Sequence, residues 1–130
     1  MLVYLVRHAK AAPGEPDELR PLTAEGLRQA LDLGKRLAAA EQPPAAVRTS
    51  PLLRARQTGD AIAQAAGITS EPDERLAPGA TADAIRALTA DGQSPIVIVG
   101  HQPDCGQIAA ELSGGPEPRF PATGVVAIEL

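Results

Sequence analysis

Two short apolar segments, residues 2–6 and residues 95–99, constrain the fold of this 130-residue chain more than any other feature. Runs of this length without polar alternation are typical of strands buried on both faces, as in a parallel sheet covered by helices. Further strand-like segments at residues 46–49 and 125–130 alternate with amphipathic segments, which is the pattern of an α/β domain. We therefore expect one domain over residues 1–130, with a mostly parallel central sheet and helices on both faces.

Capping residues indicate where two of the helices begin. Thr23 precedes a segment whose predicted apolar face includes Leu27 and Leu31. A threonine at this place can accept a hydrogen bond from the first turn of the helix. Ser50 and Pro51 are predicted to be the N-cap and the first position of a second helix.

Basic residues follow the ends of three predicted strands. Arg7 and His8 come directly after the first apolar run. His101 follows the second run after one glycine, and Arg54 lies in the helix that begins after residues 46–49. The carboxyl ends of parallel strands meet at one edge of an open sheet, where ligands bind.

The residue types at this edge favour a phosphoryl group as the ligand. Guanidinium groups match phosphate oxygens, and a neutral imidazole can attack phosphorus. His8 has to be neutral for this role, and nearby arginine charges are expected to lower its pKa below the ordinary value of about 6.5.

Composition excludes several other functions. Tyr4 and Phe120 are the only aromatic residues, so a surface that stacks nucleic-acid bases is not expected. The net charge of -4 argues against non-specific binding to DNA or to anionic membranes. Two histidines without Asp or Cys at ligand spacing predict no metal site. The only cysteine, Cys105, is expected to be packing material in a reducing compartment, and the first apolar run is too short for a signal peptide, so we expect a cytoplasmic protein.

Four ordered motifs carry a resemblance to the histidine phosphatase superfamily. They are LVRHAK at residues 5–10, RPLT at residues 20–23 with Gly26, SPLLRARQT at residues 50–58 and VGHQP at residues 99–103. Within that family, the short chain is most similar to the phosphohistidine phosphatase branch, the SixA type.

The resemblance implies both a fold and a set of roles. The fold is a phosphoglycerate-mutase-like three-layer sandwich, and the chemistry needs no cofactor. His8 is the implied nucleophile, while Arg7, Arg54 and His101 are implied to hold the phosphoryl group. Arg20 resembles a further substrate-binding arginine of the short members.

One departure from the larger members of the family bears on the substrate. Those members have an acidic residue that protonates the leaving oxygen, and the polar loop expected at residues 71–80 offers no clear match. Glu74 and Asp83 are candidate substitutes. General acid help is worth about 10²–10⁴-fold in rate, and an alkoxide needs it more than an imidazole does.

The sequence therefore favours a monomeric phosphatase that hydrolyses phosphohistidine on a phosphorylated protein, through a covalent intermediate on His8. Two alternatives stay open. One is an enzyme of the same chemistry that acts on a small phosphomonoester, and the other is a non-catalytic phosphate-binding module.

Some charged residues near the predicted site have simpler interpretations. Arg20 could pair with Asp17 or Glu18 on its own loop. Lys10 and Arg56 are expected to be solvated surface charges.

Overall fold

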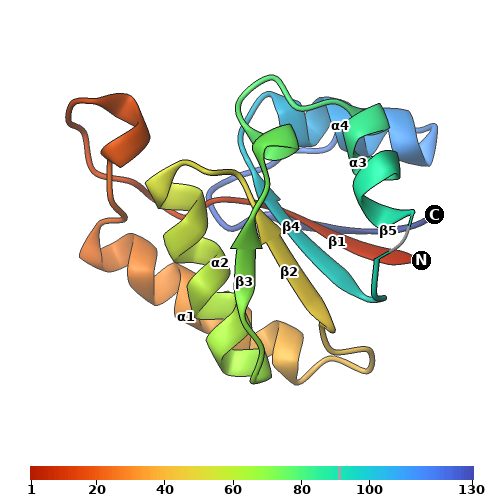
Figure 1. The fold of residues 1–130 in the computed structure, drawn as a ribbon, viewed down its shortest axis with the longest axis horizontal. Coiled ribbons are helices and arrows are strands. Elements are labelled where there is room, and N and C mark those ends of the chain that lie inside the picture. Colours follow the sequence, from red (N-terminus) through yellow and green to blue (C-terminus); the bar gives the residue numbers. More distant parts are fainter. Residues whose placement is uncertain (91) are drawn as a thin grey trace.

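The computed structural model describes residues 1–90 and 92–130, and its centre is a five-stranded sheet of order β3-β2-β4-β1-β5 (Figure 1). The strands are β1 (Leu2–Arg7), β2 (Ala46–Thr49), β3 (Ser70–Pro72), β4 (Ile96–Gly100) and β5 (Val125–Glu129). The first four run parallel, whereas β5 pairs with β1 in the antiparallel direction. The predicted, mostly parallel α/β sheet is confirmed.

Helices cover both faces of the sheet. The helices α1 (Ala24–Ala38) and α2 (Leu53–Ala66) lie on one face, and α3 (Ala82–Thr89) and α4 (Asp104–Ser113) lie on the other (Figure 1). Two short 3₁₀ helices, η1 (Asp17–Leu19) and η2 (Glu74–Leu76), interrupt the loops. Within the described residues, none of these helices is long and apolar enough to cross a membrane.

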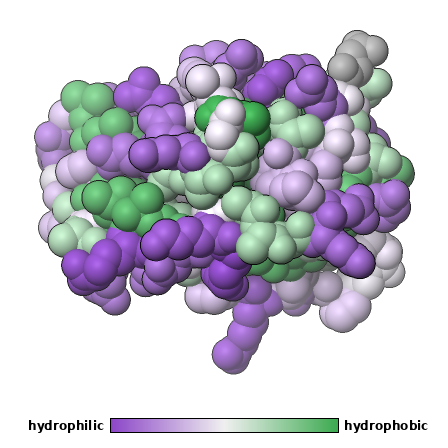
Figure 2. Space-filling view, turned by 90° about the horizontal axis from the view of Figure 1, so that it is seen from below, coloured by the Kyte–Doolittle hydropathy of each residue, from purple (hydrophilic) through white to green (hydrophobic). Residues whose placement is uncertain are grey.

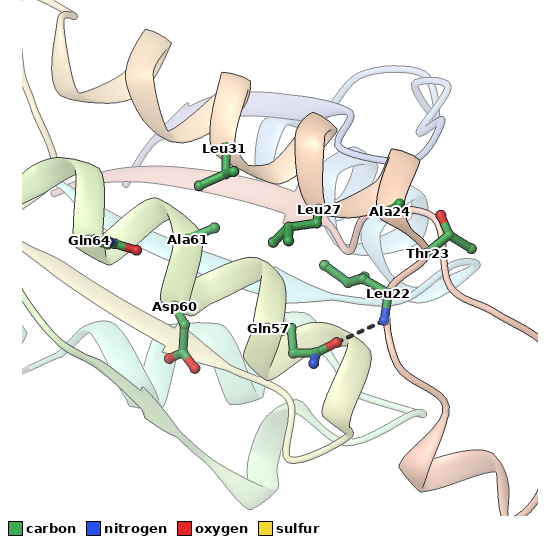
Figure 3. Close-up of a pocket in the computed structure, with 9 residues that line it drawn as sticks. All are labelled: Leu22, Thr23, Ala24, Leu27, Leu31, Gln57, Asp60, Ala61 and Gln64. Carbon is green, nitrogen blue, oxygen red and sulfur yellow. Dashed lines mark hydrogen bonds between the residues drawn. The ribbon is translucent and has the colours of Figure 1, made fainter.

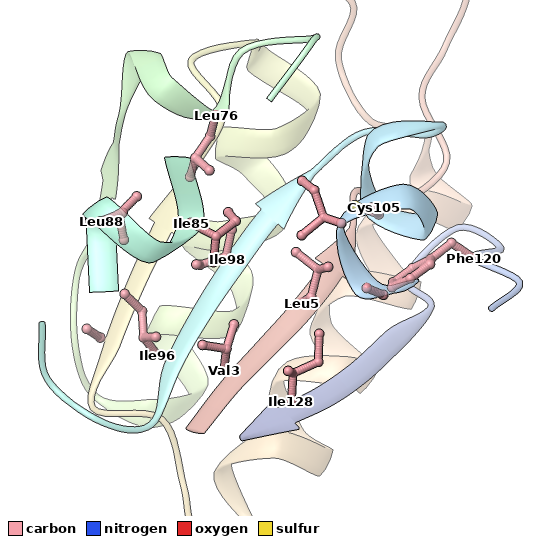
Figure 4. Packing of buried hydrophobic residues seen from close by; sticks show 13 residues of the cluster. Val3, Leu5, Leu76, Ile85, Leu88, Ile96, Ile98, Cys105, Phe120 and Ile128 are labelled. Carbon is pink, nitrogen blue, oxygen red and sulfur yellow. The ribbon is translucent and has the colours of Figure 1, made fainter. Parts of the chain in front are cut away.

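Side chains of the central strands β1 and β4 pack into two different hydrophobic cores, one on each face of the sheet. One core lies between the sheet and the α3–α4 layer (Figure 4). The other lies between the sheet and the α1–α2 layer. Because side chains alternate between faces along a strand, both β1 and β4 must be apolar at nearly every position. The first core contains Val3, Leu5, Ile96, Ile98, Ile85 and Ile108, and the second contains Val6, Val97, Val99, Leu33, Leu37 and Ile62.

Part of the buried face of α1 differs from the prediction, whereas Ala30, Gly34 and Leu37 are buried, as the helical pattern predicts. Leu27 and Leu31 are 47% and 37% exposed, and Leu33 faces the core instead. The cause is the close approach of α1 to α2, where a side chain on Gly34 would lie 2.9 Å from the carbonyl oxygen of Ala61. Small residues occupy the line of contact, so the larger leucines lie beside it. On one face of the molecule, hydrophobic surface appears as separate patches among hydrophilic side chains (Figure 2).

The short strand β3 lies where the sequence predicted a loop. It pairs with β2 through Ser70, Glu71 and Pro72 at the edge of the sheet. Its side chains are exposed or half-buried, so it has none of the apolar character that marks the central strands.

The first turn of α1 packs directly on the segment that follows His8. The side-chain oxygen of Thr23 accepts a hydrogen bond from the backbone N–H of Gly26, which confirms the predicted cap. The backbone N–H of Thr23 donates to the carbonyl oxygen of Lys10 over 3.0 Å. A Cβ atom on Gly26 would lie only 2.0 Å from that same oxygen. Gly26 is therefore required where the backbone of α1 lies directly against the backbone of Lys10.

We expect Gly26→Ala to lower the free energy of unfolding by about 1–3 kcal/mol, since the added methyl group must displace either α1 or the segment after β1. Urea denaturation measures this loss. Gly115→Ala is the matched control, because its nearest neighbour lies at 3.6 Å. Equal urea midpoints for the two variants would contradict the expected clash.

Candidate active site

Strand register brings the two histidines together at the carboxyl edge of the sheet. Arg7 of β1 pairs with Gly100 of β4, and the backbone N–H of His8 donates to the carbonyl oxygen of Gly100 over 3.0 Å. His101 is the next residue of that neighbouring chain segment. The ring centroids of His8 and His101 are 5.2 Å apart.

A backbone contact fixes the orientation of the His8 ring. Its Nδ1 lies 2.7 Å from the carbonyl oxygen of Ala9. Because a carbonyl oxygen only accepts, Nδ1 carries the proton and Nε2 keeps its lone pair. The backbone N–H of Ala9 donates to the hydroxyl oxygen of Thr58, and that hydroxyl donates to the carbonyl oxygen of Arg54. The helix α2 therefore holds Ala9, the residue whose carbonyl group orients the His8 ring.

Main-chain carbonyl groups anchor the two nearest arginines. Nη1 of Arg7 donates to the carbonyl oxygen of Phe120 over 2.9 Å. Nη1 of Arg54 donates to the carbonyl oxygen of Asp17, also over 2.9 Å. The Arg54 side chain is only 9% exposed, so its position is well restricted. These contacts leave other N–H groups of each guanidinium for a ligand.

Arg20 joins the same cluster through Asp17. The two carboxylate oxygens of Asp17 accept separately, one from Nη1 of Arg20 at 3.0 Å and the other from Nη2 of Arg54 at 3.2 Å. Nε of Arg20 donates to the carbonyl oxygen of Ala12. The simple pairing with Asp17 therefore occurs, and it also places Arg20 close enough to His8 for its charge to lower the His8 pKa.

Two side-chain nitrogens are buried without a hydrogen-bond partner in the part of the chain that the structure describes. They are Nε of Arg7 and Nδ1 of His101. Buried polar atoms without a partner are uncommon, and each calls for an explanation. The other ring nitrogen of His101, Nε2, lies 2.7 Å from the hydroxyl oxygen of Ser50.

Both histidines are held in the neutral form. Burial is the main cause that lowers the pKa of His8 from 6.5, and the charges of Arg54, Arg7 and Arg20 lower it further. The hydrogen bond to Ala9 acts in the opposite direction. The expected direction of the arginine effect is confirmed, although burial contributes more. For His101, burial and the neighbouring His8 lower the pKa to about 4.

The low pKa of His101 predicts a loss of stability on mild acidification. Below pH 6.5 the unfolded chain binds a proton at His101 that the folded protein does not take up until about pH 4. Stability is therefore greatest above pH 6.5 and falls as the pH decreases. Between pH 7 and pH 5, above the ordinary carboxyl range, we expect a loss of about 1–2 kcal/mol from this group.

Urea denaturation of the wild type and of His101→Gln at both pH values measures this contribution. The variant should lose less stability than the wild type between pH 7 and pH 5. An identical pH dependence in the two proteins would show that His101 does not titrate as described.

A separate hollow lies between α1 and α2 (Figure 3). Leu22, Leu27 and Leu31 line it, and the side-chain oxygen of Gln57 accepts from the backbone N–H of Leu22 at its edge. None of the predicted site residues faces it, and among the described residues Asp60 is the only acidic or basic one that lines it. This hollow therefore has no cationic group for a phosphoryl ligand.

Sequence reasoning missed the roles of Ser50 and Thr58. Ser50 was predicted to cap α2, but the N-cap position is Leu52, and the Ser50 side chain contacts His101. The prediction was wrong because Pro51 and Leu52 continue the turn before the helix starts. Thr58 lies one helical turn after Arg54, so its position on the same face of α2 was readable, but its contact with Ala9 was not.

The remaining candidates lie outside this cluster of contacts. Glu74 is exposed, and Asp83 pairs with Arg86 on its own helix at 2.8 Å. Lys10 is exposed as expected and pairs with a glutamate of α1. Cys105 is buried among apolar side chains, and burial raises its pKa to about 12, which confirms packing as its role.

A parallel sheet with two neutral histidines and three anchored arginines at its carboxyl edge defines a phosphate-handling α/β enzyme. The family model of the histidine phosphatase superfamily (branch 1) matches residues 3–78. The chain belongs to this superfamily, and the expected phosphatase-type hydrolase is confirmed at that level.

Individual relatives are similar over most of their length. Phosphohistidine phosphatase SixA of Escherichia coli (strain K12) is 29% identical over 134 residues, covering 98% of this chain and 83% of that protein. An uncharacterized protein of Picosynechococcus sp. is 36% identical over 124 residues, covering 88% and 74%. The structure of the protein histidine phosphatase SixA complexed with tungstate matches with a TM-score of 0.89 at 28% identity, covering 100% of this chain and 88% of that one.

Proposed function

We propose that this protein hydrolyses phosphohistidine on other proteins, through a phosphohistidine formed on its own His8. It acts in this proposal as a single-domain, cytoplasmic monomer. The observation that carries the proposal is the pairing of an oriented, neutral His8 with two buried nitrogens, Nε of Arg7 and Nδ1 of His101, that have no hydrogen-bond partner among the described residues.

In the first step, Nε2 of His8 attacks phosphorus and the bond between phosphorus and the substrate nitrogen breaks. The negative charge on the phosphoryl oxygens strengthens the hydrogen bond from every nearby donor. Arg7 and Arg54 supply guanidinium N–H groups, and His101 supplies a neutral N–H. A phosphoryl oxygen at this place would give the two unpartnered nitrogens the acceptors that they lack.

In the second step, water attacks the phosphoryl group on His8 and its bond to Nε2 breaks. The products are inorganic phosphate and the original neutral imidazole, so no net change remains on the enzyme. Thr58 and the carbonyl group of Ala9 keep the ring in the same orientation for both steps.

The charge state of the nearby carboxylates favours a phosphoramidate over a phosphate ester. Asp17 is the carboxylate whose charge acts on His101, and its hydrogen bonds to Arg20 and Arg54 hold its own pKa below the ordinary value. It is therefore ionised at neutral pH and is a poor proton donor. A phosphohistidine substrate needs no such donor, because its second ring nitrogen can take up a proton from the solvent beforehand, so that the group leaves as neutral imidazole.

Two peptides of the same sequence test this proposal, one with phosphohistidine and the other with phosphoserine at the same position. We expect kcat/KM to be at least about 100-fold higher for the phosphohistidine peptide, since only the ester needs a general acid. Faster turnover of phosphoserine would favour the phosphomonoesterase. Phosphate binding without turnover of either peptide would identify a binding module.

A further inference from the structure

Among the described residues, the Ser50 hydroxyl group is the only hydrogen-bond partner of the His101 ring. Ser50 is fully buried, and its Oγ lies 2.7 Å from Nε2 of His101. The end of β2 places it there, because the backbone N–H of Ser50 donates to the carbonyl oxygen of Val99 in β4. Neighbouring strand ends thus bring this serine beside the histidine that follows β4.

The hydrogen atoms of this pair can be assigned by counting donors and acceptors. Ser50 Oγ already accepts from the backbone N–H of Leu52 at 3.2 Å. Among residues 1–90 and 92–130, the structure records no acceptor for the Ser50 hydroxyl hydrogen other than Nε2 of His101. If Nε2 carried the proton, the serine hydrogen would have no acceptor and Nδ1 would be a buried lone pair without a donor.

The opposite assignment removes both problems. When Ser50 donates to Nε2, the His101 proton must be on Nδ1. The unpartnered atom of the ring is then an N–H donor, ready for a phosphoryl oxygen. In the other tautomer, the ring would direct a lone pair at an anion, which is repulsive.

We propose that Ser50 is a positioning residue that holds His101 as the Nδ1–H tautomer, so that its proton faces the phosphoryl group. The tautomer follows from the contacts alone, while the identity of the acceptor rests on the proposed function. Because the pKa of His101 is lowered to about 4, the ring is neutral at pH 7 and the choice of tautomer is the relevant variable.

Nitrogen NMR of protein labelled with ¹⁵N-histidine tests the proposal directly. The chain contains two histidines, so the long-range proton–nitrogen correlations of both rings can be separated. We expect both to be Nδ1–H tautomers in the wild type, His8 because of Ala9 and His101 because of Ser50. Free imidazole side chains in water favour the Nε2–H form, so this result is not the default. A wild-type His101 in the Nε2–H form would overturn the proposal.

Removal of the Ser50 hydroxyl group provides a second test of the same proposal. In Ser50→Ala we expect His101 to shift to the Nε2–H form, with His8 unchanged as the internal standard. Ser50→Thr, which keeps a hydroxyl, should retain the Nδ1–H form, and Ser113→Ala is a matched control on α4. An unchanged His101 tautomer in folded Ser50→Ala would contradict the assignment.

Anion binding and turnover are measured separately from the tautomer. Tungstate should shift the His101 Nδ1 signal of the wild type, and kcat for a phosphohistidine peptide should fall about 10- to 100-fold in Ser50→Ala, by analogy with residues that orient metal-binding histidines. If no substrate is turned over but the tautomers are as expected, the proposed function fails and the role of Ser50 stands. A normal kcat in Ser50→Ala together with a changed His101 tautomer would contradict the positioning role of Ser50.

Discussion

Replacing His8 by alanine is expected to abolish turnover of a phosphohistidine peptide, with a fall in kcat of at least about 10⁴-fold. The expected loss is this large because neither Cys105 nor His101 can replace the nucleophile. Nε2 of His8 is free and neutral, whereas the thiol of Cys105 is buried and its pKa is raised to about 12. Nδ1 of His101 carries a proton in our assignment, so that ring nitrogen cannot attack phosphorus.

The same variant should lose covalent labelling. Rapid acid-free quenching of the wild type during turnover is expected to leave acid-labile phosphate on the protein, and His8→Ala should carry none. Tungstate binding by His8→Ala is the control for an intact pocket, because the arginines remain. Labelled His8→Ala would place the covalent intermediate on another residue and refute the proposed mechanism.

Arg54→Lys is expected to lower kcat/KM by at least about 100-fold, although the charge is kept. The guanidinium of Arg54 uses two N–H groups to bind Asp17 and still has others for a phosphoryl oxygen. A lysine ammonium group has a single nitrogen and cannot fill both positions. The Asp17 segment would therefore lose an anchor at the same time as the phosphoryl group loses a donor.

Arg56→Lys is the matched control, because Arg56 lies two residues further along α2 and is exposed. Steady-state kinetics should show wild-type values for Arg56→Lys and a large loss for Arg54→Lys. If Arg54→Lys had the same wild-type kinetics as Arg56→Lys, charge and not guanidinium geometry would explain the role of position 54.

Local pattern was sufficient to predict the main strands and their direction. The apolar runs are typical of strands covered on both faces, and a common rule for parallel sheets then placed Arg7, His8 and His101 at one edge. The edge strand β3 was missed because exposed polar residues carry no such pattern. The position of Leu27 was wrong because helix periodicity does not show how closely two helices approach each other.

Contacts between segments that are distant in the sequence could not be predicted from the sequence. Asp17 and Arg54 are 37 residues apart and meet through an irregular segment after β1. The partnership of Ser50 with His101 spans 51 residues and depends on the register of β2 against β4. Neither a capping rule nor a spacing rule contains this information, so the serine was interpreted as a helix cap.

The arginine anchors have a consequence for how this protein can diverge. Arg7 and Arg20 are held by the carbonyl groups of Phe120 and Ala12, and a carbonyl group is present whatever side chain a residue carries. The side chain of Ala12 can therefore change without removing the anchor of Arg20, whereas Asp17 cannot change freely, because its carboxylate binds both Arg20 and Arg54. Surface side chains whose backbone alone anchors an arginine can thus vary from one descendant to another, while the arrangement of the arginines is inherited unchanged.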